Sequence, residues 1–431
     1  MRPASHLVLA TVSVSLLTLP HVSGGLAAGE TLYVKTSGTD SANCTTAAPC
    51  LTIAHAVSVA DSGDTIAVEP GTFGEGDGIT IEKDLTIAGG WWLATRGTLG
   101  WLDPSRKNRA VFSIEPGVKV KLSGLTISGG GMGGIYNQGS LTLTNVWIWN
   151  NTRQGGIYNS KTGSLFMTNV GIDHNSGAAG LANDGTVLVI DSHIQETRTG
   201  PPIGNGVTNT GTLIMSRGLI AGNDGAGLSQ FTYTSTECTA TTLLLNVTIS
   251  GNHDRGIDAA CGQLILRHVT IAANTAKTGA GGLQVRHTTP VVENSIVATN
   301  NGKQCGFLGG FGENSISISH SLVGDGSCIL IPDSTAGNLV GVDPKLSALA
   351  YRAGEDLIAK LFQIGANRVQ ALLPGSPAID SGADALCKDP IPLFGEGWLT
   401  DQFGVGRPVD GDGDGAARCD MGAYEYQPPP K

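Results

Sequence analysis

A spaced asparagine motif recurs through the middle of the chain and constrains its fold more than any other feature. A polar residue is followed three positions later by an apolar residue, and three positions after that by Asn, as in Asn145, Ile148 and Asn151. The apolar position recurs every 21 to 29 residues from Ile127 to Val323. A repeat of this length without helical periodicity is typical of a parallel β-helix. The same spacing, with some substitutions, occurs in Asn169-Ile172-Asn175, Asp191-Ile194-Thr197, Arg217-Ile220-Asn223, Asn246-Ile249-Asn252, His268-Ile271-Asn274 and Asn294-Val297-Asn300.

The asparagines themselves have a structural explanation. A coil turns corners inside a stack, so the corner N–H and C=O groups are buried by neighbouring coils and need partners. Asn offers both a donor and an acceptor, and it tolerates left-handed backbone conformations. A second set, Asn137, Asn159, Asn183 and Asn209, follows a second apolar anchor at a fixed distance. We therefore expect both sets to form ladders along the stack rather than to bind a ligand.

These repeats predict an all-β fold, a right-handed parallel β-helix with caps at both ends. The 63 Gly residues among 431 fit a solenoid rich in turns, and a solenoid grows in one dimension without splitting into domains. We expect an N-terminal cap and first coil over residues 29–78, containing strands Thr31–Lys35 and Asp64–Val68 and a helix within Pro49–Ala60. The β-helix would cover residues 79–339. A loop-rich C-terminal domain would cover 340–431, with helical spacing at Asp356–Gln363.

The N-terminus and the cysteines both indicate export. Residues 1–28 have a basic start, a short apolar run and small residues before a cleavage point, which is typical of a signal peptide. No later stretch is long and apolar enough to span a membrane. The eight cysteines fall into sequential pairs, two of them one coil apart and so about 5 Å from each other. We predict disulfide bridges in an oxidising compartment, pairing Cys44 with Cys50, Cys238 with Cys261, Cys305 with Cys328, and Cys387 with Cys419.

The charge balance limits the class of partner. The net charge is −10, and no basic stripe is present to neutralise phosphates, so nucleic acid binding is disfavoured. The balance is compatible with a polysaccharide or a cell-surface glycan. We expect a monomer.

A column of charged residues lies at or next to the ladder position on successive coils. Residues at equal offsets on adjacent coils stack about 5–10 Å apart, so these side chains could line one groove. Such a groove could bind or cleave an acidic glycan, whereas exposed charges could simply keep rods from pairing sideways. The candidate catalytic residues are Arg198, His253, Asp254 and Arg255, and the candidate substrate-binding residues are Arg153, Asp173, His174, Glu196 and Asp224. Arg286 and His287 form a weaker second candidate.

An acidic run near the C-terminus is a candidate metal site. Asp410, Asp412 and Asp414 alternate with glycines, and Asp420 follows nearby. Carboxylates spaced in this way can curl round Ca²⁺, although the Glu that an EF-hand requires is missing. A hydrated acidic turn is the alternative. We expect no other cofactor.

Two further groups of residues have structural and functional interpretations. Trp91, Trp92 and Trp101 could form a platform for sugar rings or could cover the first coils. In the C-terminal region, Asp401, Arg407 and Glu425 are expected to form a buried polar network.

Several segments resemble known exported bacterial proteins. The segment Thr31–Phe73, with PCLTIAHAV and GDTIAVEPGTF, resembles the opening of secreted pectin-lyase-like β-helix proteins. ALLPGSPAIDSG, TDQFGVGRP, DGDGDG and CDMGAYEYQ resemble the choice-of-anchor Q domain that ends many right-handed β-helix proteins of bacteria. Because no apolar tail follows, the resemblance implies a secreted or cell-surface protein without covalent or membrane anchoring.

The resemblance implies no particular activity, because this fold carries lyases, hydrolases, epimerases and adhesins. The regular coils contain neither the adjacent Asp pair nor the Gly-His-Gly that a polygalacturonase would show. We predict an adhesin-like protein that binds glycan or another surface. The alternative is a polysaccharide lyase on an acidic, uronate-containing polysaccharide, which would use a base and a cation from the charged column.

Overall fold

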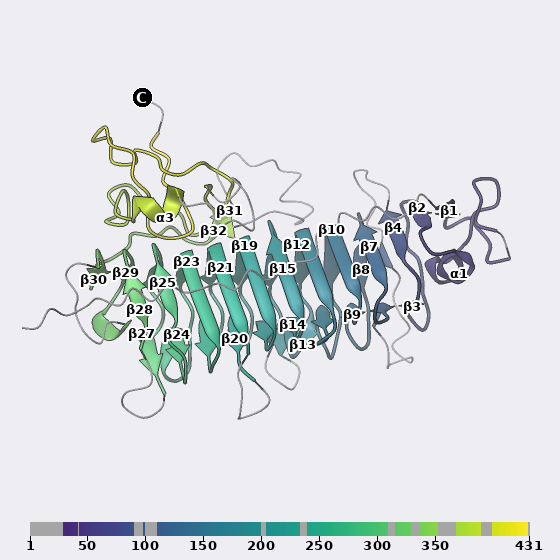
Figure 1. Cartoon of the computed structure of the whole chain (residues 1–431), viewed down its shortest axis with the longest axis horizontal. Coiled ribbons are helices and arrows are strands. Elements are labelled where there is room, and N and C mark those ends of the chain that lie inside the picture. Colours follow the sequence, from purple (N-terminus) through teal and green to yellow (C-terminus); the bar gives the residue numbers. More distant parts are fainter. Residues whose placement is uncertain are drawn as a thin grey trace, which may run out of the picture.

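The computed structural model describes residues 29–41, 43–89, 98–99, 110–199, 204–232, 239–308, 315–328, 336–351, 368–388 and 399–429. Its strands stack into an elongated solenoid, with helix α1 (Ile53–Val59) at one end and the C-terminal segments along one side (Figure 1). Almost all strand pairs are parallel, which confirms the predicted parallel β-helix. The expected helix at Asp356–Gln363 and the Trp91, Trp92 and Trp101 group lie outside the described residues.

Two large sheets build the solenoid. Sheet A contains β1 (Thr31–Val34), β2 (Thr65–Val68), β4 (Leu85–Gly89), β5 (Thr98–Leu99), β7 (Lys119–Ser123), β8 (Thr126–Ser128), β10 (Ser140–Trp149), β12 (Ser164–Asp173), β15 (Thr186–Ile190), β16 (His193–Gln195), β19 (Thr212–Ala221), β21 (Thr241–Ser250), β23 (Gln263–Ala272), β25 (Val291–Glu293), β26 (Ile296–Ala298), β28 (Ser317–Ser319), β29 (Leu322–Val323) and β30 (Leu339–Val340). Sheet B contains β3 (Ile79–Ile81), β6 (Phe112–Ile114), β9 (Ile135–Asn137), β11 (Ile157–Asn159), β14 (Ala179–Asn183), β18 (Asn205–Asn209), β20 (Leu228–Gln230), β22 (Ile257–Ala259), β24 (Ala280–Val285) and β27 (Lys303–Phe307).

Sheet A bends in the middle of each coil. In β10 the buried side chains alternate as Leu141 and Leu143, and the alternation restarts at Val146 and Ile148. Asn145 between them has φ of 55°, so the chain turns a corner there and both halves point their apolar residues inward. The equivalent corner residues also have positive φ: Asn169, Asp191, Arg217, Asn246, His268, Asn294 and His320.

Both predicted asparagine ladders are present and fully buried over most of their length. In the first, Asn223 Nδ2 donates to Asn252 Oδ1 at 2.8 Å, and Asn252 Nδ2 donates to Asn274 Oδ1 at 2.8 Å. In the second, Asn159 Nδ2 donates to Asn183 Oδ1 at 2.9 Å. The amides also bind corner carbonyls, as Asn274 Nδ2 does with Ile249 O at 3.1 Å. The ladders therefore satisfy the backbone groups that the coil stack buries.

The N-terminal end and the disulfides follow the sequence predictions. Strands β1 and β2 and helix α1 lie within the expected ranges, and Thr52 caps the helix by accepting a bond from His55 N. Disulfides join Cys44 to Cys50 and Cys387 to Cys419, and Cys305 to Cys328 with a Cα–Cα distance of 4.8 Å, as expected for one coil. Cys261 is also disulfide-bonded, and Cys238 lies outside the described residues.

The C-terminal region lies against the outer side of sheet A, over the strand halves that follow the corner. It contains β31 (Ala350–Tyr351), β32 (Arg368–Val369) and α3 (Asp384–Lys388). We call the outer side of these strand halves, those that follow the corner, the covered face. Its apolar contacts join Ile296, Ala298 and Leu322 of the solenoid to Leu372, Ala378, Ile379 and Met421. Among the described residues, no helix has the length and apolarity needed to cross a membrane.

Candidate functional site

Side-chain contacts join members of the predicted column into two groups. The bonds from Asp224 N to Thr197 O and from His253 N to Asn223 O place Arg198, Asp224 and His253 at one offset on three successive coils. Arg153 and Arg198 are both exposed, and Arg153 Nη1 lies 3.6 Å from Met132 Sδ. His174 and Glu196 occupy left-handed positions on adjacent coils, and His174 Nε2 lies 2.6 Å from Glu196 Oε2. Their positions on the coil match the prediction, because equal offsets on neighbouring coils bring side chains together.

A second group lies further along the solenoid. We call Asp224, His253, Asp254, Arg255, Asp258 and Arg286 the charge cluster. His253 Nδ1 is 3.2 Å from Asp224 Oδ1, and the His253 side chain is 64% exposed. Arg255 Nη1 lies 3.7 Å from Asp254 Oδ2 and 3.4 Å from Asp258 Oδ2.

Arg286 completes the charge cluster. Its Nη2 donates to both oxygens of Asp258, at 2.8 and 2.9 Å. Sequence reasoning missed Asp258, which lies in β22 on the outer side of sheet B and not in the loop column. Each arginine is thus already bonded to a carboxylate, which offsets the positive charge that an acidic ligand would meet.

Asp173 lies apart from the other candidates. Its side chain is completely buried on the covered face, where Oδ2 accepts from Trp147 Nε1 at 2.5 Å and lies 2.9 Å from His193 Nε2. Asp173 is buried, whereas His174, the next residue in the sequence, is partly exposed, so the two side chains do not belong to one site. The partner His193 is likewise only 1% exposed.

The acidic run and Asp380 come together in part. Asp410 and Asp412 lie with Asp380, and one oxygen from each is within 4.8 Å of the others. Asp414 and Asp420 are not in this group. Asp420 is buried, and its Oδ1 accepts from Asp380 N at 2.8 Å. Carboxylate oxygens suit Ca²⁺, so the site that the sequence suggested stays a prediction, with Asp380 as the residue that spacing could not reveal.

The expected polar network in the C-terminal region is present. Arg407 Nη1 donates to Glu425 Oε2 at 2.6 Å, and both side chains are almost fully buried. Asp401 Oδ2 accepts from Glu425 N at 3.1 Å. Burial, followed by the nearby charge of Glu425, raises the pKa of Asp420 to about 8, and burial also raises the pKa of Glu425 and of Asp401.

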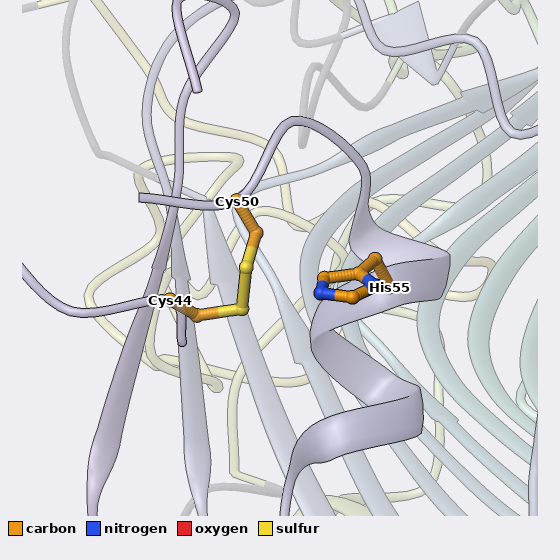
Figure 2. A group of neighbouring side chains, drawn as sticks. All are labelled: Cys44, Cys50 and His55. Atoms are coloured by element: carbon orange, nitrogen blue, oxygen red, sulfur yellow. A yellow bond between two sulfur atoms is a disulfide. The ribbon is translucent and has the colours of Figure 1, made fainter. Parts of the chain in front are cut away.

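A group of potential metal ligands at the N-terminal end has a structural role. Cys44, Cys50 and His55 have ligand atoms within 4.8 Å of one another, and Figure 2 shows the imidazole beside the sulfur atoms. The two sulfur atoms are joined in a disulfide, however, and metal binding requires thiolates. The Cys44–Cys50 disulfide therefore closes a loop of the N-terminal cap, and His55 of α1 lies beside it.

The outer side of sheet B, which we call the open face, carries a feature that sequence reasoning missed. Its outward side chains form one column in register: Thr80, Ser113, Tyr136, Tyr158, Ala182, Thr208, Ser229, Asp258, Gln284 and Gly306. Tyr136 and Tyr158 stack with ring centroids 5.4 Å apart, and Tyr158 donates to Asp184 Oδ2 at 2.6 Å. The repeated Ile-Tyr-Asn of β9 and β11 is the sequence signal that would have predicted this stack.

Two hollows lie next to this column. The first, of about 360 Å³, is lined by Thr80, Ala110, Ser113, Glu115, Met132, Tyr136 and Gln154. The second, of about 290 Å³, lies between α1 and β3 and shares Thr80 with the first. Together they extend the open face toward the N-terminal cap, whereas the charge cluster lies several coils away on the same face.

Comparison with known proteins places the fold. No protein-family model matches the chain, and no curated protein matches it in sequence. Among solved structures, pectate lyase Pel9A is similar, with 15% identity, a TM-score of 0.51, and coverage of 94% of this chain and 98% of that chain. The complex of XylC with xylose has 13% identity and a TM-score of 0.48, covering 92% of this chain and 98% of that chain. The chain thus has the pectate lyase-like parallel β-helix fold, and such identities concern the fold alone.

Proposed function

We propose that this chain is a secreted or surface-associated carbohydrate-binding protein, adhesin-like, which holds a glycan along the open face. The observation that carries the proposal is the column of sheet B, where two stacked aromatic rings and the hydroxyl groups of Thr208 and Ser229 recur at the spacing of one coil. Flat aromatic rings pack on the apolar faces of sugar rings, and hydroxyl and amide groups bond to sugar hydroxyls. A surface of this kind can follow an extended chain without cleaving it.

Four further observations support the proposal. The arginines of the charge cluster are bonded to carboxylates of the chain itself, so they are already paired before any ligand arrives. The apolar run in residues 1–28 and the disulfides agree with a protein exported to an oxidising compartment. The C-terminal segments resemble a domain of exported bacterial β-helix proteins. Solved structures with a similar fold include a pectate lyase.

The test is binding to a panel of neutral and acidic polysaccharides, measured by affinity electrophoresis of the mature chain. We expect retarded migration on at least one polysaccharide, with no change in its chain length. A bulky residue in the middle of the open face, Thr208→Trp, should weaken the retardation. The matched control is Thr142→Trp, which alters a half-exposed threonine on the outer side of sheet A. Equal loss in both variants, or no retardation on any polysaccharide, would refute binding on the open face.

A polysaccharide lyase acting on uronate polymers is the second candidate, and the charge cluster favours it. Asp224 could orient the exposed His253 as a base, and Arg255 lies two residues further along the same loop. Incubating the chain with acidic polysaccharides, with and without Ca²⁺, and following the ultraviolet absorbance of unsaturated uronate ends tests this activity. A signal lost in His253→Ala and Arg255→Ala would replace the binding proposal with the lyase.

A further inference from the structure

We propose that the hollow beside Tyr136 is a binding subsite for an uncharged pyranose, so that the ligand of the open face is a neutral rather than a uronate glycan. This inference rests on the proposed function, since it names the ligand class and the place of its strongest contact. It depends on how the tyrosine stack ends, on which groups line the hollow, and on where the nearby cations lie.

The tyrosine stack ends at Tyr136, which lines the first hollow. Tyr158 packs on one side of Tyr136, with the two ring planes only 19° apart, and the bond to Asp184 holds Tyr158 in place. On the other side of Tyr136, the next residue of the column is Ser113, followed by Thr80. These side chains are much smaller than tyrosine, so the column of rings stops and the hollow takes its place. A pyranose in the hollow would continue the stack by laying its apolar face on Tyr136.

The size and lining of the hollow suit a sugar. Its volume of about 360 Å³ falls at the lower end of the range of small-molecule sites. Gln154, Ser113 and Thr80 provide donors and acceptors, and Glu115 provides an acceptor with two oxygens. Sugar hydroxyls donate to a carboxylate in strong hydrogen bonds, whereas a uronate would bring a second negative charge close to Glu115.

Among the described residues, the nearby cations Lys83 and Arg153 do not line the hollow itself. Glu115 is the one charged residue among the described residues that line it. Lys83, in the adjacent hollow, donates to the carbonyl oxygens of Val57 and Ser58 at the end of α1, at 3.3 and 3.2 Å. Arg153 lies on the rim, where its guanidinium group contacts the sulfur of Met132. The described groups that line the hollow therefore favour an uncharged ligand.

The experiment compares neutral and acidic probes on the full mature chain by isothermal titration calorimetry. The neutral probes are cellohexaose, xylohexaose and mannohexaose, and the acidic probes are hexagalacturonate and hexamannuronate. We expect at least one neutral probe to bind and the acidic probes to bind about tenfold or more weakly. If only the acidic probes bind, the neutral class is wrong while carbohydrate binding stands. If none binds, both proposals fail.

Three variants locate the subsite. Tyr136→Ala removes the ring and should raise the Kd for the neutral probe about tenfold or more. Ser113→Tyr extends the column of rings into the hollow and should block binding while leaving every existing ring in place. Glu115→Gln should raise the Kd for the neutral probe and reduce the difference between this Kd and that for hexagalacturonate. Thr142→Ala, on the outer side of sheet A and before the corner, is the control and should leave the Kd unchanged. Unchanged binding in Tyr136→Ala and Ser113→Tyr would overturn the assignment.

Discussion

The open face and the covered face are built by the same coils, yet their outward residues differ in kind. On the open face most of the column is polar or aromatic and partly exposed, as in Tyr136, Tyr158 and Thr208, whereas Gln284 near its far end is buried. On the covered face the equivalent outward column is buried from His193 through Leu219, Thr248, Thr270, Ile296 and Leu322. Strand geometry alone exposes alternate residues equally on both faces. The difference therefore reports that the C-terminal region packs on one face, whereas the described residues of the other face remain largely accessible to solvent.

The covered face is joined to the C-terminal region by specific polar bonds as well as by apolar packing. Thr248 Oγ1 donates to Gln402 Oε1 at 2.6 Å, and Thr270 Oγ1 accepts from Ala423 N at 3.0 Å. Asn294 accepts from Ala383 N at 2.8 Å. Buried polar groups of this kind need their partners, so they fix the orientation in which the region docks. A ligand on the open face would need only a few such bonds, because it must also leave.

A charge placed on each face should give the largest contrast. Thr248→Glu puts a carboxylate at a fully buried position and should lower the free energy of unfolding by about 4 kcal/mol or more, or detach the C-terminal region. Thr208→Glu makes the same change on the open face and should stay within about 0.5 kcal/mol. Urea unfolding and limited proteolysis measure both. Similar losses in the two variants would show that the open face is also occupied by protein.

Removing the buried cation of the C-terminal region should have the next largest effect. Arg407→Met leaves the carboxylate of Glu425 buried without its partner, which typically costs about 3–5 kcal/mol. Arg286→Met removes a cation that is 39% exposed on the open face, and such pairs contribute about 0–1 kcal/mol. The urea concentration at the midpoint of unfolding, measured at pH 8, compares the two variants. A loss as small in Arg407→Met as in Arg286→Met would contradict the role of the network.

The same network predicts how stability changes with pH. The folded chain keeps a proton on Asp420 until about pH 8, whereas the unfolded chain loses it near the usual pKa of 3.8. This group therefore stabilises the fold at low pH, and the contribution is lost as the pH rises toward 8. Burial lowers the pKa of His268 well below 6.5, so the unfolded chain binds a proton there first and stability falls as the pH drops below about 6.5.

Between pH 3.8 and 6.5 these two contributions change with opposite sign and offset each other, so stability should vary little there. Above about pH 6.5 the carboxyl groups dominate, so we expect Tm to fall by several degrees between pH 6.5 and 9. Asp420→Asn should flatten this alkaline limb, since the amide does not titrate. A Tm that rises over this range in the unmodified chain would show that the sign is wrong. Glycan binding on the open face should not follow the same profile.

The sequence predicted the interior of this molecule better than its outer faces. Residues such as Ile148, Ile172 and Asn175 pack on the equivalent residues of the adjacent coils, so the sequence repeat alone determines their neighbours. The two outer faces depend on partners distant in the chain. Asp173 was assigned to a loop groove because of its offset, but it ends β12, after the corner at Asn169, and the alternation of that strand turns its side chain under the covered face. Asp258 and Asp380 were missed because their partners, Arg286 and Asp412, come from other coils or segments.

Calcium should have the smallest effect, and it would act on the C-terminal region alone. One oxygen each of Asp380, Asp410 and Asp412 lies within 4.8 Å of the others, where like charges repel and a hard cation would relieve the repulsion. At a Ca²⁺ concentration about ten times the Kd, binding to the folded chain adds about 1.4 kcal/mol. We therefore expect a small rise in Tm on adding Ca²⁺, reversed by a chelator and absent in Asp412→Asn.

Asp414→Asn is the matched control, because Asp414 lies outside this group and should keep the rise. A Tm that ignores Ca²⁺ would leave the run as an acidic turn held by backbone N–H groups, as Asp410 already is by Gly413 N at 2.8 Å. If Ca²⁺ raised Tm and also tightened glycan binding, the C-terminal region and the open face would be energetically coupled. We do not expect such coupling, because the bonds described above lie within each face.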